Sequence, residues 1–366
     1  EGYQVLTIED VLPYADIFNG MTVFNVCIPV VALVNAGVPV ILFELAARDG
    51  DANANVRKAI DGLRKLDPSP LAVAAVADRI ETANYDQDLE RLRDCDLIVE
   101  AVAERMDIKR ALYEKVAPFI AEHALVASNT SGLSIDALAD ALPAALRARF
   151  CGVHFFNPPR YMVLVELIGA RNTEPALLDR LEAFLTTTLG KGVIRAKDTP
   201  NFIANRIGVF SVLAAMHHTL GLRLGFDEVD AITGTLIGRP KSATYRTADL
   251  VGLDTLGHVV NTMKEQLPDD PWHRYFGLPP WYQGLLQQGA LGQKTGRGIY
   301  RKGERGIEVL DAGSMSYRES NKGADPAVVD ILKTRDAGER FRLLRESEHV
   351  QARFVWAITR DMLHYC

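Results

Sequence analysis

Apolar and polar positions in the first half of the chain follow two alternating periods. Nearly continuous apolar runs rich in β-branched residues predict buried strands, and stretches with apolar residues every three or four positions predict amphipathic helices. The runs are "VPVILFEL" (38–45), "DLIVEAVAE" (96–104), "ALVASNTS" (124–131) and "FCGVHFF" (150–156), and helices are expected over 55–66 and 107–121. This alternation predicts a doubly wound, mainly parallel α/β sheet over residues 1–197.

The pattern becomes helical near residue 198. A long apolar segment runs from Phe202 to about Leu224, and two further amphipathic stretches follow it. Pro200 is tolerated in a first helical turn, and Thr199 or Asp198 would cap that helix. We therefore expect a mostly α-helical second domain over residues 198–366.

The last stretch, "HVQARFVWAITRDMLHYC", predicts an amphipathic helix without a stop signal. We therefore expect the sequence to be a fragment of a longer polypeptide. A helix that lacks its packing partner would expose the apolar side chains of Phe354, Trp356, Ile358 and Leu363, and such a patch would favour aggregation or oligomer formation.

Composition narrows the class of protein. At 366 residues, 48% hydrophobic residues and 24% charged residues, the chain is globular and long enough for two cores. A net charge of −6 argues against nucleic-acid binding, although it leaves room for a local basic patch. The four cysteines have no metal-ligand spacing, and the longest apolar stretch is too short for a membrane span. These features predict a soluble, cytoplasmic protein without a metal site or an integral membrane segment.

Several predicted strands end in polar residues, which are Glu44, Glu104, Ser128, Asn129, Thr130, Ser131, His154 and Asn157. Ligands of open parallel sheets bind outside the carboxyl ends of the strands. We therefore expect these side chains to line one crevice.

His154 and Glu166 lie on either side of a proline pair that forces the chain out of regular structure. If the two flanking segments run back along each other, Glu166 can accept a hydrogen bond from one ring nitrogen of His154. Such a bond orients the imidazole and stabilises its protonated form, as a general base requires. The alternative is that His154 is a structural core histidine and Glu166 a solvated strand end, which is the commoner case for an isolated His/Glu pair.

Two further polar segments add to this pair. "SNTSGLSI" places Asn129 and Ser131 at a strand end, before a helix that Ser134 would cap. Ser and Asn are also common turn formers, so capping and ligand contact are equally consistent with these residues. Asn205 follows among apolar neighbours, where its amide must find a partner in the protein or on a ligand.

Six segments then carry a family resemblance: "SNTSGLSI", "CGVHFFNPP", "LVELI", "DTPNFIANR", "GRPKSATYRTADLVGLD" and "ALGQKTGRGIY". In this order and at these intervals, the chain from about residue 33 to its end closely resembles the bacterial 3-hydroxyacyl-CoA dehydrogenases of fatty-acid β-oxidation. The branch with the dehydrogenase ahead of an enoyl-CoA hydratase domain is particularly similar. The resemblance implies a Rossmann-type first domain, an acyl-CoA substrate, NAD as cofactor, and a homo-oligomer or a larger multifunctional chain.

Residue roles follow from the resemblance where the motifs match. It implies that His154 is the acid/base residue, oriented by Glu166, and that Ser131 and Asn205 hold the C3 oxygen of the substrate. Asn157 lies close enough to His154 in sequence to help shape the site, and Arg64 and Lys65 are candidates for contacts with CoA. On the cofactor side, Glu44 would bind the adenosine ribose and favour NAD over NADP. Glu104, Lys109 and Asn129 match positions around the nicotinamide, although Lys109 could equally be a solvated helix lysine.

One expected feature is missing from residues 17–45, which otherwise have the layout of a strand, a turn, a helix and a second strand. The three glycines that cradle the pyrophosphate should fall near Met21, Val23 and Val26. Side chains there would obstruct the turn, and Pro29 would interrupt the helix that should face the phosphates. Either the chain has lost its cofactor, or residues 1–32 do not represent the natural sequence. We favour the second explanation because the proton-transfer motifs are intact.

Two classes of function therefore remain. The first is an active NAD-dependent 3-hydroxyacyl-CoA dehydrogenase. The second is a catalytically silent acyl-CoA-binding or scaffolding module that keeps the fold. Titration of the chain with NADH, followed by acetoacetyl-CoA reduction, distinguishes them.

Overall fold

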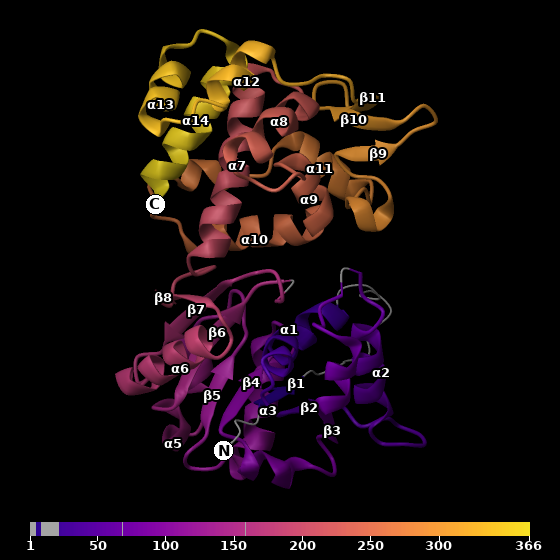
Figure 1. The fold of residues 1–366 in the computed structure, drawn as a ribbon, viewed down its shortest axis with the longest axis vertical. Coiled ribbons are helices and arrows are strands. Elements are labelled where there is room, and N and C mark those ends of the chain that lie inside the picture. Colours follow the sequence, from indigo (N-terminus) through magenta and orange to yellow (C-terminus); the bar gives the residue numbers. More distant parts are fainter. Residues whose placement is uncertain (1–4, 9–21, 68, 158) are drawn as a thin grey trace. The chain divides into compact units, whose positions relative to one another are not determined.

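The computed structural model describes the backbone over residues 5–8, 22–67, 69–157 and 159–366, with the side chains from residue 29 onward in those ranges. The chain divides into two compact units, Glu1–Ile203 and Ala204–Cys366. We describe each unit by itself (Figure 1).

Within the described residues, the first unit contains an eight-stranded sheet. Its strands are β1 (Val5–Ile8), β2 (Val40–Glu44), β3 (Ile80–Asn84), β4 (Leu97–Glu100), β5 (Leu125–Ser128), β6 (Phe150–Phe155), β7 (Leu164–Gly169) and β8 (Gly192–Ala196). They lie in the order β3-β2-β1-β4-β5-β6-β7-β8. Neighbouring strands are parallel except for β6 and β7, which are antiparallel. The predicted mainly parallel sheet is confirmed.

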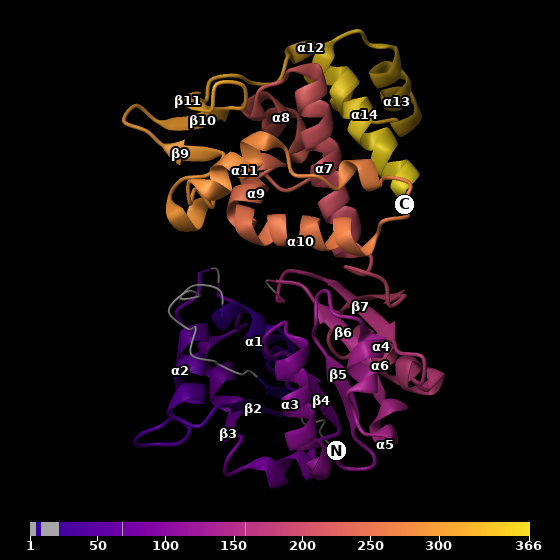
Figure 2. The ribbon, with the colours of Figure 1, turned by 180° about the vertical axis from the view of Figure 1, so that it is seen from behind.

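Helices cover both faces of this sheet, as Figures 1 and 2 show from opposite sides. Residues of α1 (Thr22–Asn35), α2 (Ala54–Leu63) and α6 (Pro175–Thr187) share one hydrophobic cluster with side chains from one face of the strands. Residues of α3 (Met106–Val116), α4 (Ile135–Asp140) and α5 (Ala144–Arg147) pack on the opposite side in two further clusters. The first unit is therefore doubly wound, as its alternating pattern predicts.

The glycine-poor stretch lies partly outside the described residues. The strand expected from Ile17 and the position of Met21 fall there, and β1 is instead formed by Val5–Ile8. The expectation that Pro29 interrupts the following helix is wrong, since α1 runs through Pro29 to Asn35. Proline removes one backbone donor, and the buried residues around Val30 and Leu33 still pack this helix on the sheet.

The second unit is mostly helical, as predicted. Its helices are α7 (Ala204–Leu222), α8 (Phe226–Thr233), α9 (Tyr245–Val251), α10 (Leu253–Gln266), α11 (Pro280–Gln287), α12 (Pro326–Leu332), α13 (Ala337–Glu346) and α14 (Val350–Tyr365). It also contains a small antiparallel sheet that the helical pattern did not predict, formed by β9 (Tyr300–Lys302), β10 (Ile307–Asp311) and β11 (Ser316–Glu319). Short 3-10 turns in the two units are η1 (Ala74–Arg79), η2 (Leu89–Asp94), η3 (Ala117–Phe119), η4 (Thr235–Ile237), η5 (His273–Tyr275) and η6 (Gln293–Thr295).

The long apolar helix begins later than expected. Phe202 has a positive φ, so α7 starts at Ala204 and Pro200 is not in its first turn. Asp198 does not cap α7 either. Its carboxylate accepts hydrogen bonds from the backbone N–H groups of Ile135 and Asp136 at the start of α4, where it supplements the Ser134 cap.

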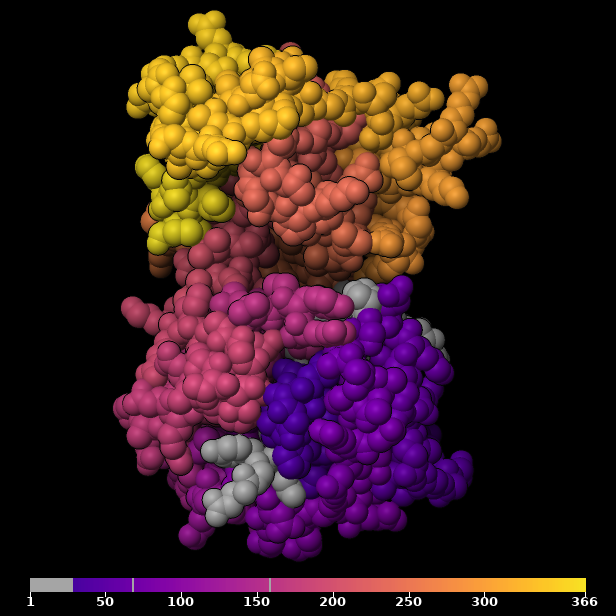
Figure 3. Space-filling model, viewed as in Figure 1, coloured from indigo at the N-terminus to yellow at the C-terminus, as the bar shows by residue number. Residues whose placement is uncertain are grey.

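The C-terminal helix is packed rather than exposed. Phe354 and Ile358 are 0% and 2% exposed within the core of the second unit, so the predicted apolar patch is wrong for these two residues. Trp356 contacts Phe341 of α13, whereas Leu363 is exposed. α14 contacts α7, α8 and α13, and the yellow C-terminal residues lie beside the rest of their unit in Figure 3.

Candidate active site

The candidate acid/base pair is built by the strand register. β6 and β7 are antiparallel neighbours, and their register places His154 directly opposite Glu166. The His154 Nδ1 atom lies 2.7 Å from Glu166 Oε2, so the expected hydrogen bond forms. The two side chains are 4% and 0% exposed. Burial removes competing water and strengthens this charge-assisted bond.

The second oxygen of Glu166 is also engaged. The backbone N–H of Ile203 donates to Glu166 Oε1 at 2.8 Å. On the imidazole, the rings of Phe156 and Phe202 lie 4.4 and 5.8 Å from the His154 ring centre. The pair is therefore held by contacts on the carboxylate and by aromatic packing on the ring, and His154 Nε2 is the nitrogen that Glu166 does not occupy.

Glu104 organises the loop that carries Ser131. Its Oε1 atom accepts hydrogen bonds from the backbone N–H groups of Ser131 and Gly132, at 2.9 and 2.8 Å, and from the Thr130 hydroxyl at 2.5 Å. Ser131 itself is exposed at the carboxyl end of the sheet. The carboxylate of Glu104 therefore fixes the backbone that presents the Ser131 hydroxyl.

Asn129 and Ser134 have structural partners. The Asn129 Oδ1 atom accepts the backbone N–H of Phe155 at 3.0 Å, which ties the end of β5 to the end of β6. The Ser134 hydroxyl accepts the N–H of Ala137, so the predicted N-cap of α4 is confirmed. Both residues stabilise the loop between them.

Sequence reasoning missed Glu100, the last residue of β4. Its carboxylate is 1% exposed and accepts hydrogen bonds from Lys109 Nζ at 2.6 Å, the backbone N–H of Val102, the Tyr113 hydroxyl and the Ser128 hydroxyl. Burial, and then the neighbouring Glu100 carboxylate, raise the pKa of Tyr113. An acid inside an otherwise apolar strand run was the available signal, since a buried carboxylate needs donors.

Lys109 is fully buried, so the alternative that it is a solvated helix lysine is wrong. Its ammonium group donates to Glu100 and to the Val102 carbonyl, and lies 3.8 Å from Glu104 Oε2. Lys109 therefore links the buried carboxylate of Glu100 to the carboxylate of Glu104, which holds the Ser131 loop.

The remaining predicted residues come from the ends of β2 and α2, the segment after β6, and the second unit. Glu44 ends β2, is 4% exposed, and its Oε1 atom accepts the N–H of Leu45. Arg64 pairs with Asp61 and Asp78, while Lys65 is exposed. Asn157 is exposed after β6, and Asn205 is the second residue of α7 in the second unit.

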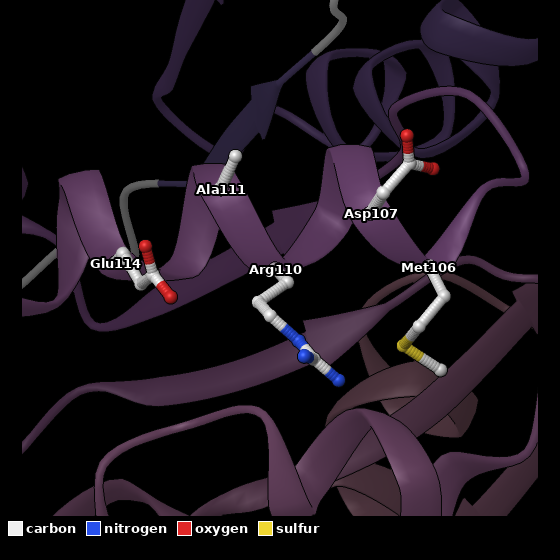
Figure 4. A pocket seen from close by; sticks show the side chains of 5 residues that line it. All are labelled: Met106, Asp107, Arg110, Ala111 and Glu114. Carbon is white, nitrogen blue, oxygen red and sulfur yellow. The ribbon is translucent and has the colours of Figure 1, made fainter.

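A separate shallow pocket of about 520 Å³ lies on α3. Figure 4 shows its lining side chains, Met106, Asp107, Arg110, Ala111 and Glu114, which all come from this one helix. A catalytic site needs several groups that converge from different elements. We therefore do not take this pocket as the candidate active site.

Two motifs of the second unit are explained by buried carboxylates. Asp230 accepts the backbone N–H groups of Thr244 and Tyr245, and Asp249 accepts those of Ile299 and Tyr300. Burial raises the pKa of both aspartates to about 6. Asp230 therefore holds the "GRPKSATYR" segment in place, and Asp249 holds the "GQKTGRGIY" segment.

Metal-ligand clusters and membrane-spanning helices are both absent from the described residues. Within the residues that the structure describes, no three His, Cys, Asp or Glu side chains are placed to hold a metal ion. None of the helices in that part of the chain has the length and apolarity that crossing a bilayer requires.

The order of the first six strands, β3-β2-β1-β4-β5-β6, defines a Rossmann-type dinucleotide-binding domain. Family models agree with this class. Residues 29–199 match "3-hydroxyacyl-CoA dehydrogenase, NAD binding domain", and residues 202–302 match "3-hydroxyacyl-CoA dehydrogenase, C-terminal domain". The chain therefore belongs to the 3-hydroxyacyl-CoA dehydrogenase family, and the resemblance in its motifs is confirmed.

Individual relatives are consistent with this family. A Bacillus subtilis protein whose name includes "3-hydroxyacyl-CoA dehydrogenase" is 36% identical over 91% of this chain and 44% of its own length. A Rickettsia felis protein whose name includes "fatty acid oxidation complex trifunctional enzyme" is 35% identical over 79% of this chain and 41% of its own length. The chain thus spans less than half the length of these two relatives.

A solved structure gives the same result for the fold. The (S)-3-hydroxybutyryl-CoA dehydrogenase PaaH1 from Ralstonia eutropha is 25% identical, with a TM-score of 0.65, and the match covers 83% of this chain and 100% of that one.

Proposed function

We propose that the chain oxidises (3S)-3-hydroxyacyl-CoA to 3-oxoacyl-CoA with NAD as the hydride acceptor, in fatty-acid β-oxidation. The observation that carries this proposal is the buried hydrogen bond between His154 and Glu166. A histidine oriented by a carboxylate is suited to move a proton at a substrate hydroxyl. Family membership supports the same reaction.

His154 is the proposed general base. Because Nδ1 is hydrogen-bonded to Glu166, the imidazole presents Nε2 to the substrate. Nε2 takes the proton of the C3 hydroxyl. The buried carboxylate stabilises the imidazolium that forms. In the reverse reaction, His154 returns the proton to the C3 oxygen.

Ser131 and Asn205 are the proposed donors to the C3 oxygen, where negative charge develops during proton transfer. Glu104 supports the role of Ser131, because it holds the backbone of residues 131 and 132. For the rest of the substrate, we propose that Asn157 shapes the acyl site and that Arg64 and Lys65 contact CoA.

The described residues fit NAD on the adenosine side. Glu44 ends the second strand of a 3-2-1-4 sheet, which is the position of the acid that binds the ribose hydroxyls in this fold. Glu104, Lys109 and Asn129 are the proposed residues of the nicotinamide half. When bound, NAD supplies the acceptor for the hydride that leaves C3.

We also propose that the complete protein is a larger multifunctional β-oxidation chain or a homo-oligomer in the cytoplasm. The name of the Rickettsia felis relative, which includes "trifunctional enzyme", supports the larger multifunctional chain. Cys95 and Cys151 are buried free thiols, and burial raises the pKa of both thiols to about 12. Inert buried thiols are consistent with a reducing compartment.

The test is oxidation of (3S)-3-hydroxybutyryl-CoA by the 366-residue chain with NAD, followed by identification of the product. We expect acetoacetyl-CoA and stoichiometric NADH, and no reaction with the (3R) isomer as the matched control. Binding of acyl-CoA without any turnover would contradict the proposal and favour the silent acyl-CoA-binding module.

A further inference from the structure

Two consecutive residues before α7 adopt left-handed backbone conformations. Asn201 has a φ of 61° and Phe202 has a φ of 48°. Asparagine adopts this region readily, but for a bulky aromatic residue it is a strained conformation. Such a conformation persists only when the surrounding contacts hold it.

Hydrogen bonds hold this segment from both sides. Before the turn, the Asp198 carboxylate accepts the Ser134 hydroxyl at 2.7 Å and the backbone N–H groups at the start of α4. Within the turn, the Phe202 N–H donates to the Thr199 carbonyl at 2.9 Å. After it, the Ile203 N–H donates to Glu166 Oε1 at 2.8 Å.

The contacts of this turn converge on the proposed acid/base pair. Phe202 is 2% exposed, and its ring lies 5.8 Å from the His154 ring centre. The next residue, Ile203, supplies the donor for the Glu166 oxygen that does not face the histidine. With both oxygens fixed, the carboxylate cannot rotate away from Nδ1.

We propose that residues 201–203 form a positioning clasp for the His154–Glu166 pair. The left-handed turn brings one ring onto the imidazole and one N–H onto the carboxylate, and thereby holds the imidazole in the tautomer with its proton on Nδ1. Asn201, Phe202 and Ile203 are positioning residues that act through the pair. This inference rests on the proposed function.

The Asn201 side chain offers a competing explanation that the experiment must separate. It is 4% exposed, and its Nδ2 atom has no hydrogen-bond partner among the described residues. Its Oδ1 atom lies 3.5 Å from the place that a Cβ would take on Gly132. The amide itself could therefore serve a ligand, independently of the backbone conformation.

Asn201→Gly and Asn201→Val distinguish the backbone from the amide. Glycine adopts positive φ without strain, whereas a β-branched residue does not. We measure kcat for acetoacetyl-CoA reduction by the 366-residue chain. We expect kcat of Asn201→Gly to stay within about twofold of the unmodified chain. We expect kcat of Asn201→Val to fall about tenfold or more, because small displacements of groups near the reacting atoms are costly. The ¹⁵N spectrum of His154 should keep its Nδ1–H signature in the glycine variant and show mixed tautomers in the valine variant.

Met315→Val is the matched control. Met315 also has a positive φ, 55°, in the turn between β10 and β11 of the second unit. This substitution introduces the same backbone conflict away from the clasp. It should lower the melting temperature without changing kcat or the His154 signals.

Three results would overturn the clasp. One is equal loss of activity in both Asn201 variants, which would assign the effect to the amide. Another is an Asn201→Val variant with unchanged kcat and ¹⁵N signals. If Asn201→Val does not fold, Phe202→Leu decides, and unchanged kcat and signals there are the third result. The ¹⁵N measurement does not require turnover. If the unmodified chain is inactive but Asn201→Gly and Asn201→Val still differ in the His154 tautomer, the proposed function fails and the clasp stands.

Discussion

At the scale of single residues, two buried glutamates satisfy their oxygens in different ways. Glu100 accepts from a lysine, a tyrosine, a serine and a backbone N–H, and so holds the ends of β4 and β5 together. Glu166 shares its oxygens between His154 and a backbone N–H. An ionised carboxylate left without such donors in a buried site would be strongly destabilising. The first arrangement supports the sheet edge, and the second leaves an imidazole nitrogen for chemistry.

Glu44 carries a prediction at this scale. Its carboxylate at the end of β2 should repel the 2′-phosphate of NADPH, so the chain should prefer NADH. Glu44→Ala should narrow that preference, measured as the ratio of kcat/KM for the two cofactors in acetoacetyl-CoA reduction. The control is Glu81→Ala, which removes an exposed acid on the neighbouring strand β3. Equal use of both cofactors by the unmodified chain would refute the assignment.

The His154–Glu166 pair could be predicted from the sequence because one local feature determines it. The His154–Glu166 contact follows from a proline-containing turn that reverses the chain between two strand runs. The roles of Glu100 and Lys109 did not follow, because their contacts join β4, α3 and β5 across the sheet edge. No spacing in the sequence specifies that juxtaposition.

At the scale of elements, the loops of the helical unit are fixed by buried carboxylates. Asp249 is buried and accepts hydrogen bonds from the Ile299 and Tyr300 N–H groups at 2.9 and 2.8 Å. A Cβ on Gly298 would lie only 2.2 Å from Asp249 Oδ1, so glycine is required for this close approach. This explains why the "TGRGIY" motif carries a glycine at this position.

Asp249 makes a pH-dependent prediction. Burial raises its pKa in the folded chain from 3.8 to about 6, so the folded state binds a proton more tightly than the unfolded state. Its contribution to stability is therefore fully present below the unfolded value and is lost as the pH rises through about 6. The difference in unfolding free energy between the unmodified chain and Asp249→Asn should fall over this window and then become constant. A difference that rises over the same window would contradict this account.

The packing of α14 makes a second prediction for an element. Phe354 is 0% exposed and Leu363 is 62% exposed on the same helix. Phe354→Ala should reduce the free energy of unfolding by about 3–5 kcal/mol, because it leaves a cavity in the core. Leu363→Ala should change it by no more than about 0.5 kcal/mol. Chemical denaturation measures both, and similar effects would show that α14 is not packed as described.

Element types were more predictable than element boundaries. Alternating periods were enough to predict the doubly wound unit and the helical unit. The start of α7 was missed because residues 201 and 202 adopt left-handed conformations that contacts with Glu166 and Thr199 hold in place. The burial of α14 was missed because an amphipathic pattern does not identify the surface that covers it.

At the scale of the whole molecule, the family match and the candidate active site do not include the stretch in which the three pyrophosphate-binding glycines are missing. The match to the NAD-binding domain begins at residue 29, after Met21, Val23 and Val26. The proposed proton-transfer residues all fall within the matched ranges. The proposed chemistry therefore depends on residues outside the glycine-poor stretch.

The most direct test of the central claim is the turnover number for acetoacetyl-CoA reduction by NADH, compared between the unmodified chain and Glu166→Gln. A glutamine can accept from Ile203 or face His154 with its oxygen, but it cannot stabilise the imidazolium. The account predicts a folded variant with turnover lowered on the order of 10²-fold or more, and His154→Gln at least as impaired. The matched control, Glu174→Gln at the exposed start of α6, should retain activity. Near-normal turnover in Glu166→Gln would contradict the account and remove the pair from the mechanism.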